Sequence, residues 1–169
     1  MIYGEKNAVL REIKNQLRAN MTLLKFLYYV NVTDKDILIL PDLTSEQVRD
    51  TVDKCIFNYP KLEANKAADM GCYICLNYGT KQYHYEDNKY FNGNTFDIYI
   101  ICDRDIDFNT VNGSRIYAIE DCIAGTFDPG EVSAIGLSRV EYSEPVAVRG
   151  TNYIGVHIAL SFFDKPRWN

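Results

Sequence analysis

Residues 96–103 read Phe-Asp-Ile-Tyr-Ile-Ile-Cys-Asp, and apolar side chains occupy every second position of this stretch. That period is typical of a β-strand with one side in an apolar core. The last predicted strand repeats it: Ile154, Val156, Ile158, Leu160 and Phe162 face one way, and Gly155, His157, Ala159 and Ser161 face the other. Residues 72–76 and 135–142 supply two further predicted strands, the latter followed by a turn around Pro145.

Helices are predicted mainly in residues 1–69. The apolar stripe of a first helix is formed by Val9, Leu10, Ile13 and Leu17. Asn20 is a suitable N-cap for a second, shorter helix. The segment Thr44-Ser-Glu-Gln47 has the capping-box pattern of a third helix. We expect that helix to stop near Asn58-Tyr-Pro60, because proline cannot continue the hydrogen-bonding ladder.

A fourth helix is predicted after residue 113, with Ser114 as its cap and Gly125 at its left-handed closing position. The order of elements lacks the regular alternation of strand and helix that a doubly wound sheet requires. The sequence therefore predicts a single α+β domain over residues 1–169, with an antiparallel or mixed sheet of about four strands and helices on one face. Residues 79–95, which are poor in aliphatic side chains, are predicted to form an exposed loop or hairpin.

Composition limits the functional class. The formal net charge of −5 and the scattered Lys and Arg residues disfavour a protein that grips the nucleic acid backbone. The first residues lack the pattern of a signal peptide, and no apolar stretch has the length of a membrane span, so we expect an intracellular protein. In that setting the five cysteines are expected to be reduced core residues.

No sequence motif indicates catalysis or metal binding. The segment Asp103-Arg-Asp105-Ile-Asp107 begins like a calcium loop, but Phe108 and Ser114 stand where that loop needs Gly and Glu. The pair Cys72-x-x-Cys75 has no second pair to complete a zinc site, and residues three apart on a strand point to opposite faces. We therefore expect no enzyme activity, no metal and no cofactor. The alternative is a small enzyme whose site is assembled from distant residues such as His84, Cys102 and Asp103.

Four aromatic residues gather in the predicted loop or hairpin, namely Tyr83, Tyr85, Tyr90 and Phe91. Aromatic side chains give a large contact area for little lost conformational entropy, which favours a protein interface. The alternative is that this hairpin folds back on its own sheet.

The later part of the chain carries an ordered set of short motifs: Gly113-Ser-Arg-Ile-Tyr-Ala-Ile-Glu-Asp-Cys-Ile123, the strand Ile135-Gly-Leu-Ser-Arg-Val140, and Asn152-Tyr-Ile-Gly155. With the strand at residues 96–103, this pattern resembles the tail terminator and tail-completion proteins of long-tailed bacteriophages. The opening helices, with Leu23-Leu-Lys-Phe-Leu-Tyr-Tyr, look like the N-terminal part of phage neck and head–tail joining proteins. The chain departs from the simplest members at residues 35–69 and in the Tyr-rich loop.

The resemblance implies a virion protein, assembled in the host cytoplasm, that forms a ring of commonly six subunits at the head-proximal end of the tail tube. Its partners would be further copies of itself, the tail tube protein and a head-completion or connector protein. DNA would pass through the lumen without specific binding, and acidic side chains would suit a non-adhesive lumen. The residues expected to face the lumen are Asp97, Asp103, Asp105 and Asp107. The alternative is another phage connector, tube or baseplate subunit of related fold.

Overall fold

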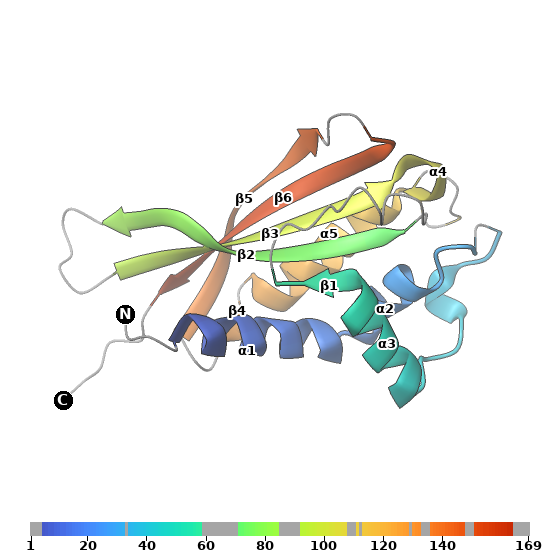
Figure 1. Cartoon of the computed structure of the whole chain (residues 1–169), viewed down its shortest axis with the longest axis horizontal. Helices are drawn as coiled ribbons and strands as arrows, with labels where there is room; N and C mark the ends of the chain where they lie inside the picture. Colours follow the sequence, from blue (N-terminus) through green and yellow to red (C-terminus); the bar gives the residue numbers. More distant parts are fainter. Residues whose placement is uncertain are drawn as a thin grey trace.

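The computed structural model describes residues 5–32, 34–58, 71–84, 92–107, 111, 113–128, 130–132, 136–147 and 151–163. Its helices are α1 (Glu5–Ala19), α2 (Met21–Tyr28), the 3-10 turn η1 (Ile37–Ile39), α3 (Ser45–Cys55), α4 (Arg104–Asp107) and α5 (Arg115–Phe127). Its strands are β1 (Ile56–Phe57), β2 (Cys72–His84), β3 (Asn92–Asp103), β4 (Gly130–Val132), β5 (Gly136–Ala147) and β6 (Tyr153–Phe163). Figure 1 shows these elements with the helices gathered along one side of the strands.

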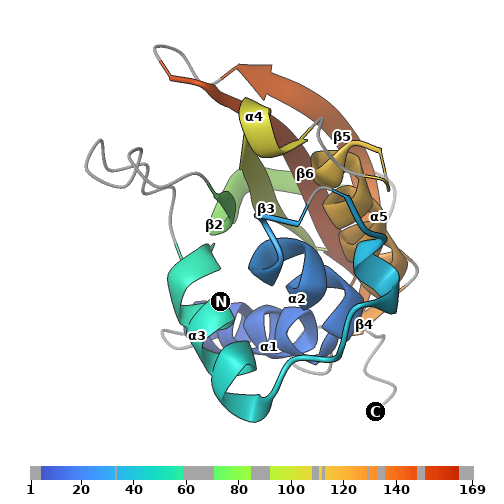
Figure 2. The same cartoon turned by 90° about the vertical axis from the view of Figure 1, so that its right-hand side faces the viewer.

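The strands form one six-stranded sheet in the order β1-β2-β3-β6-β5-β4. β1 runs parallel to β2, and every other neighbouring pair is antiparallel, so the sheet is mixed. The predicted α+β class, with helices on one face, is confirmed. Figure 2 shows the sheet curving around α5, with α1, α2 and α3 on that same side. The short strands β1 and β4 were absent from the prediction of about four strands.

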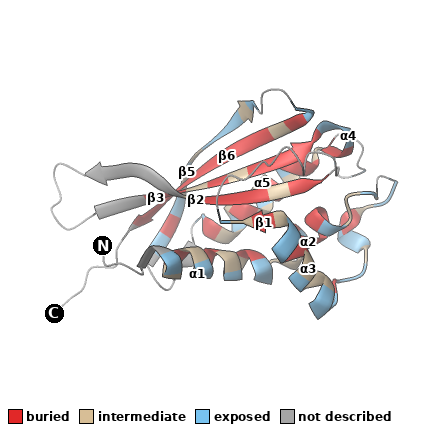
Figure 3. Cartoon of the chain, in the orientation of Figure 1, coloured by how far each residue is buried: buried red, intermediate tan, exposed pale blue. Residues whose placement is uncertain are grey.

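The core lies between the sheet and the helices. Alternate residues of β3 and β6 enter it, including Phe96, Ile98, Val156 and Ile158, all of which are buried. Val9, Ile13 and Leu17 of α1 meet them from the helix side, as the helical period predicted. Figure 3 shows the buried residues concentrated along the sheet and the inner sides of the helices.

Two predicted helix caps are confirmed. The Oδ1 atom of Asn20 accepts a hydrogen bond from the amide of Leu23 at 3.0 Å, and Asn20 also donates to the Thr126 hydroxyl on α5 at 3.0 Å. At the start of α3, Thr44 and Gln47 form the reciprocal capping box. These side chains satisfy amides that the first turn of a helix leaves without intrahelical partners.

Three predicted boundaries were wrong. The third helix ends at Cys55 rather than near residue 58, because Ile56 pairs with Ile74 in a parallel strand contact. Gly125 does not close the fourth helix: α5 continues to Phe127, and the positive φ of 83° belongs to Gly113, before the helix. The third error concerns Pro145, which lies within a strand.

β5 runs through Pro145 to Ala147 instead of turning there. Pro145 lies opposite Val156 of β6. On the other side, β4 pairs only with residues 136–138, so among the described residues the rest of β5 is an edge of the sheet. Proline has no amide hydrogen to donate, and an edge strand is where a sheet tolerates it. A register shift between Val140 and Tyr142 marks a bulge in the same edge.

A buried carboxylate, rather than the predicted Ser114 hydroxyl, caps α5. Asp107 is fully buried, accepts a hydrogen bond from the Ile116 amide at 2.7 Å and accepts the Ser114 hydroxyl at 3.0 Å. Ser114 holds the N-cap position, but its side chain makes no capping bond to the helix. The anion at this end of α5 also interacts favourably with the helix dipole.

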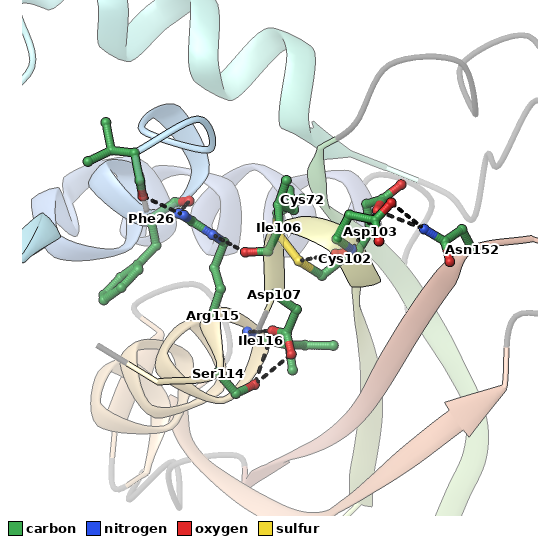
Figure 4. The surroundings of a disulfide bond; sticks show 12 residues. Phe26, Cys72, Cys102, Asp103, Ile106, Asp107, Ser114, Arg115, Ile116 and Asn152 are labelled. Atoms are coloured by element: carbon green, nitrogen blue, oxygen red, sulfur yellow. Dashed lines mark hydrogen bonds between the residues drawn. A yellow bond between two sulfur atoms is a disulfide. The ribbon is translucent and has the colours of Figure 1, made fainter. Parts of the chain in front are cut away.

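Arg115 joins α5 to two other segments, as Figure 4 shows. Its guanidinium is fully buried and donates to the carbonyl oxygens of Phe26, Val32 and Ile106 at 2.8, 3.4 and 3.4 Å. Burial lowers the pKa of Arg115 to about 10, and the nearby Asp107 opposes that shift. The Arg of the motif that resembles tail terminators is therefore a structural residue that ties α5 to α2 and α4.

A disulfide bond joins Cys72 and Cys102, which lie opposite each other on β2 and β3 with 4.3 Å between their Cα atoms (Figure 4). The expectation that all five cysteines are reduced was therefore wrong for this pair. Sequence spacing did not reveal the bond, because the facing positions depend on the register of the hairpin. Cys72 and Cys75 do point to opposite faces of the sheet, as predicted.

Candidate functional site

The face of the sheet opposite the helices is the candidate functional site, and we call it the open face. No helix among the described residues covers it (Figures 1 and 2). It is formed by alternate residues of β2, β3, β6 and β5, and its centre is Tyr99, His157, Tyr142, Asp97 and Glu144. A second group of packed side chains extends it toward β1: Phe57, Tyr73, Cys75, Ile101 and Tyr153.

His157 lies between two carboxylates. Its Nε2 atom is 3.0 Å from Oδ1 of Asp97, and its Nδ1 atom is 3.5 Å from Oε1 of Glu144. The side chains of His157 and Asp97 are 10% and 17% exposed, whereas that of Glu144 is 60% exposed. A ring nitrogen that carries a hydrogen can donate it to the carboxylate beside it, so the two carboxylates help to orient the ring. The face nevertheless keeps an excess of carboxylates over this single ring.

Two tyrosines hold the His157 ring in place. Tyr99 stacks on it with the ring centroids 4.5 Å apart, and Tyr142 meets it edge-on at 5.4 Å. Burial raises the pKa of Tyr99, with smaller contributions from the negative charges of Asp97, Tyr142 and Glu144. These ring contacts orient His157, and both tyrosines remain partly exposed on the open face.

The geometry of nucleophilic catalysis is missing from the described part of the open face. Both ring nitrogens of His157 are engaged by carboxylates, which leaves neither of them opposite a hydroxyl or thiol. Ser161 is four residues further along β6, roughly 13 Å away at strand spacing. Its hydroxyl donates to Glu141 instead.

The predicted acidic residues divide into two groups. Asp103 and Asp107 are buried and bonded within the subunit, so the expectation that they face a lumen was wrong. Asp103 accepts hydrogen bonds from Asn152 at 3.1 Å and from the Asp105 amide at 2.9 Å. Asp97 is largely shielded beside His157, and Asp105 is exposed on α4.

The predicted aromatic interface lies largely outside the described residues. β2 reaches His84 and β3 begins at Asn92, so residues 79–84 and 92–95 belong to the two strands of a hairpin. The backbone of Tyr83 pairs with Gly93. Tyr85, Tyr90 and Phe91 fall outside the described ranges.

The residues suggested for an assembled enzyme site do not meet. Cys102 is bonded to Cys72 and therefore offers no thiol, and Asp103 is buried beside it. His84 is at the far end of β2 from Cys72, roughly 40 Å along an extended strand. This set of residues is not a catalytic centre.

Neither a cluster of metal-ligating side chains nor a helix of membrane-spanning length and hydropathy occurs among the described residues. No group of three or more His, Cys, Asp or Glu side chains is arranged to hold a metal ion within these ranges. None of the described helices combines the length and the apolar content needed to span a bilayer.

A groove of about 480 Å³ is lined by residues of α2 and α3, among them Leu27, Tyr28, Gln47, Asp50 and Lys54. Gln47 donates to the Tyr28 hydroxyl at 2.8 Å.

A comparison with protein families identifies the family to which the chain belongs. The sequence model described as YomW matches residues 20–162. The chain belongs to the YomW family. YomW is a phage-derived family, and the chain is accordingly a phage-related protein. The match to YomW covers the residues named on the open face and leaves out the whole of α1. No curated protein and no solved structure matches the chain.

Sequence reasoning placed His157 on the less apolar face of the last strand but missed the cluster around it. Asp97, Tyr99 and His157 all occupied the polar positions of predicted strands, which is a usable signal. Only the register of β3 with β6, which sets Tyr99 opposite His157, brings them together.

Proposed function

We propose that the chain is a structural virion protein that forms a ring at the head-proximal end of the phage tail tube, stops tail polymerisation and joins the tail to the head connector. The observation that carries the proposal is the described part of the open face, where partly exposed Tyr99 and Tyr142 and the exposed Glu144 surround a buried histidine that two carboxylates engage. Exposed carboxylates and partly exposed aromatic rings give such a surface contact area for another protein. The phage-derived family supports the phage origin that the proposal assumes.

Other features support assembly through subunit contacts. A closed ring needs two different surfaces on each subunit, because each copy meets one neighbour on each side. The open face and the outer sides of the helices are two such surfaces on opposite sides of the molecule (Figure 2). The net charge of −5 suits a ring through which DNA passes without adhering. Asp105, which is exposed, and Asp97 remain the candidates for lumen-facing charge.

The proposal includes specific partners. We infer contacts with the tail tube protein on one side of the ring and with a head-completion or connector protein on the other. The ring of commonly six copies follows the resemblance to tail terminators. We propose no turnover, cofactor or bound metal.

The test is a length distribution of tails from infections with and without the protein, measured by electron microscopy. We expect overlong or headless tails in its absence and normal tails when it is supplied from a plasmid. Tails of normal length, joined to heads, in particles that lack the protein would contradict the proposal. Labelling of intact particles adds the location: a signal at the baseplate would assign the chain to a different part of the tail.

A further inference from the structure

The outer side of α1 carries a row of positive charge. Arg11, Lys14 and Arg18 lie three and four residues apart, which places them on one side of the helix. Arg11 and Arg18 are exposed, and Lys14 is half-buried. Among the described residues none of the three has an ion pair. We call these three residues the basic ridge.

The described part of the open face carries the opposite charge. Glu141 and Glu144 are exposed on β5, and Asp97 lies beside them across His157. Among the side chains that the structure describes there, these three carboxylates lie near one exposed arginine, Arg139, and one histidine ring. Partly exposed Tyr99 and Tyr142 lie between the carboxylates and offer apolar contact area.

The two surfaces point in different directions on one subunit. α1 packs its apolar stripe toward the sheet, so the basic ridge faces away from it, while the open face is on the far side of the sheet (Figures 1 and 2). The basic ridge and the open face of one chain therefore cannot contact each other. The two surfaces can contact each other between copies, when each copy presents its basic ridge to one neighbour and its open face to the other.

We propose that the basic ridge of one copy docks on the open face of the next copy, and that this contact joins the subunits. The inference rests on the proposed ring and names its interface. Charge complementarity determines the pairing and its orientation, because like-charged alternatives are disfavoured. The occupant of the open face is therefore a second copy of this chain rather than a separate basic protein.

The test uses charge reversal in the full-length protein, supplied during infection to a phage that lacks it. A ridge variant carries Arg11→Glu and Arg18→Glu, and a face variant carries Glu141→Lys and Glu144→Lys. A third chain carries all four substitutions and restores opposite charges between the substituted positions. A matched control, Arg49→Glu with Lys54→Glu, makes the same charge change as the ridge variant on exposed positions of α3.

The measurement is the number of copies per purified particle, by quantitative mass spectrometry, with circular dichroism melting to verify folding. We expect the number of copies per particle to fall at least about tenfold for the ridge variant and for the face variant. The four-substitution chain and the control should be incorporated at a level near that of the unsubstituted protein. Neutral Arg11→Gln with Arg18→Gln, which is milder for folding, should give a smaller loss.

Incorporation of the ridge and face variants at the unsubstituted level would overturn the inference, as would a folded four-substitution chain that fails to restore incorporation. The same particles separate this outcome from failure of the proposed function. If tail length depends on the protein but not on these charges, only the interface is wrong. If tails are normal without the protein, the ring itself is wrong.

Discussion

The two faces of the sheet are built from alternate residues of the same strands, but their side chains make different kinds of contact. On the helix side Ile158 packs in a continuous apolar core, and the buried Arg115 and Asp107 have partners within the subunit. On the open face His157 is held by carboxylates and aromatic rings, and Glu144 remains 60% exposed. The larger apolar cluster lies on the helix side, so we expect substitutions there to cost more stability than substitutions on the open face.

The largest expected effect is on the helix side. Replacing Arg115 by Leu leaves three carbonyl oxygens and the carboxylate of Asp107 without a buried cation. We expect a loss of about 3–5 kcal/mol in the free energy of unfolding, measured by urea denaturation. The control is Tyr117→Ala on the same helix, where the side chain is 55% exposed and a loss below about 1 kcal/mol is expected. A loss below about 1 kcal/mol for Arg115→Leu would contradict the structural role assigned to Arg115.

A pair of substitutions tests the two faces directly. Ile158→Ala opens a cavity in the core and should cost about 2–5 kcal/mol. Tyr142→Ala removes an edge-on ring contact from the open face and should cost about 0.5–1.5 kcal/mol. Equal losses in the same urea experiment would contradict the assignment of stability to the helix side.

Removal of the disulfide bond is a third test of how much the helix side of the sheet contributes to stability. Replacing Cys72 and Cys102 together by Ala should lower the free energy of unfolding by about 2–4 kcal/mol, because the bond closes a loop across 30 positions of the chain. A reducing agent should destabilise the unsubstituted protein and leave the double variant unchanged. Cys122→Ala is the control for removal of a thiol, and a peptide map without reduction should recover the linked pair.

The smallest expected effect is a loss of stability in alkali. Burial, followed by the charge of Asp121, raises the pKa of Cys122 on α5 to about 11 from an ordinary value near 9. The unfolded thiol therefore loses its proton first, the native state binds more protons, and the free energy of unfolding falls as pH rises through this window. Cys122→Ala should flatten that part of the profile.

Tyr99 extends the alkaline comparison to the open face. Burial raises the pKa of Tyr99 in the folded protein above its unfolded value. Its contribution to the free energy of unfolding is therefore fully present below about pH 10 and is lost at higher pH. Tyr99→Phe should remove this second component. The measurement is the urea midpoint at a series of alkaline pH values, and an unchanged profile in both variants would show that neither group matters.

Local sequence patterns predicted much of the fold because their physics is local. The alternation at residues 96–103 identified β3, and the short polar side chains of Asn20 and Thr44 identified the starts of two helices. The errors came from contacts between distant segments. Ser114 was the obvious local cap for α5, but the better acceptor arrives from Asp107 on α4.

The candidate site was harder to predict than the fold for the same reason. Tyr99 and His157 are 58 positions apart, and nothing in either stretch fixes which strands become neighbours. The Cys72–Cys102 bond also required the register of β2 with β3. The aromatic residues of the hairpin were conspicuous in the sequence, but three of the four lie outside the described ranges. Composition marks surface chemistry, whereas pairing decides which side chains meet.

The outer margin of β5 has a consequence for how copies of the chain can accumulate. A bulge at Glu141 and an imino acid at position 145 interrupt the regular row of donors and acceptors that an incoming strand would need. Fibre-like growth by continuous strand addition is therefore disfavoured at this margin. Copies that meet at this margin would therefore have to recognise each other through side chains rather than through continued main-chain pairing.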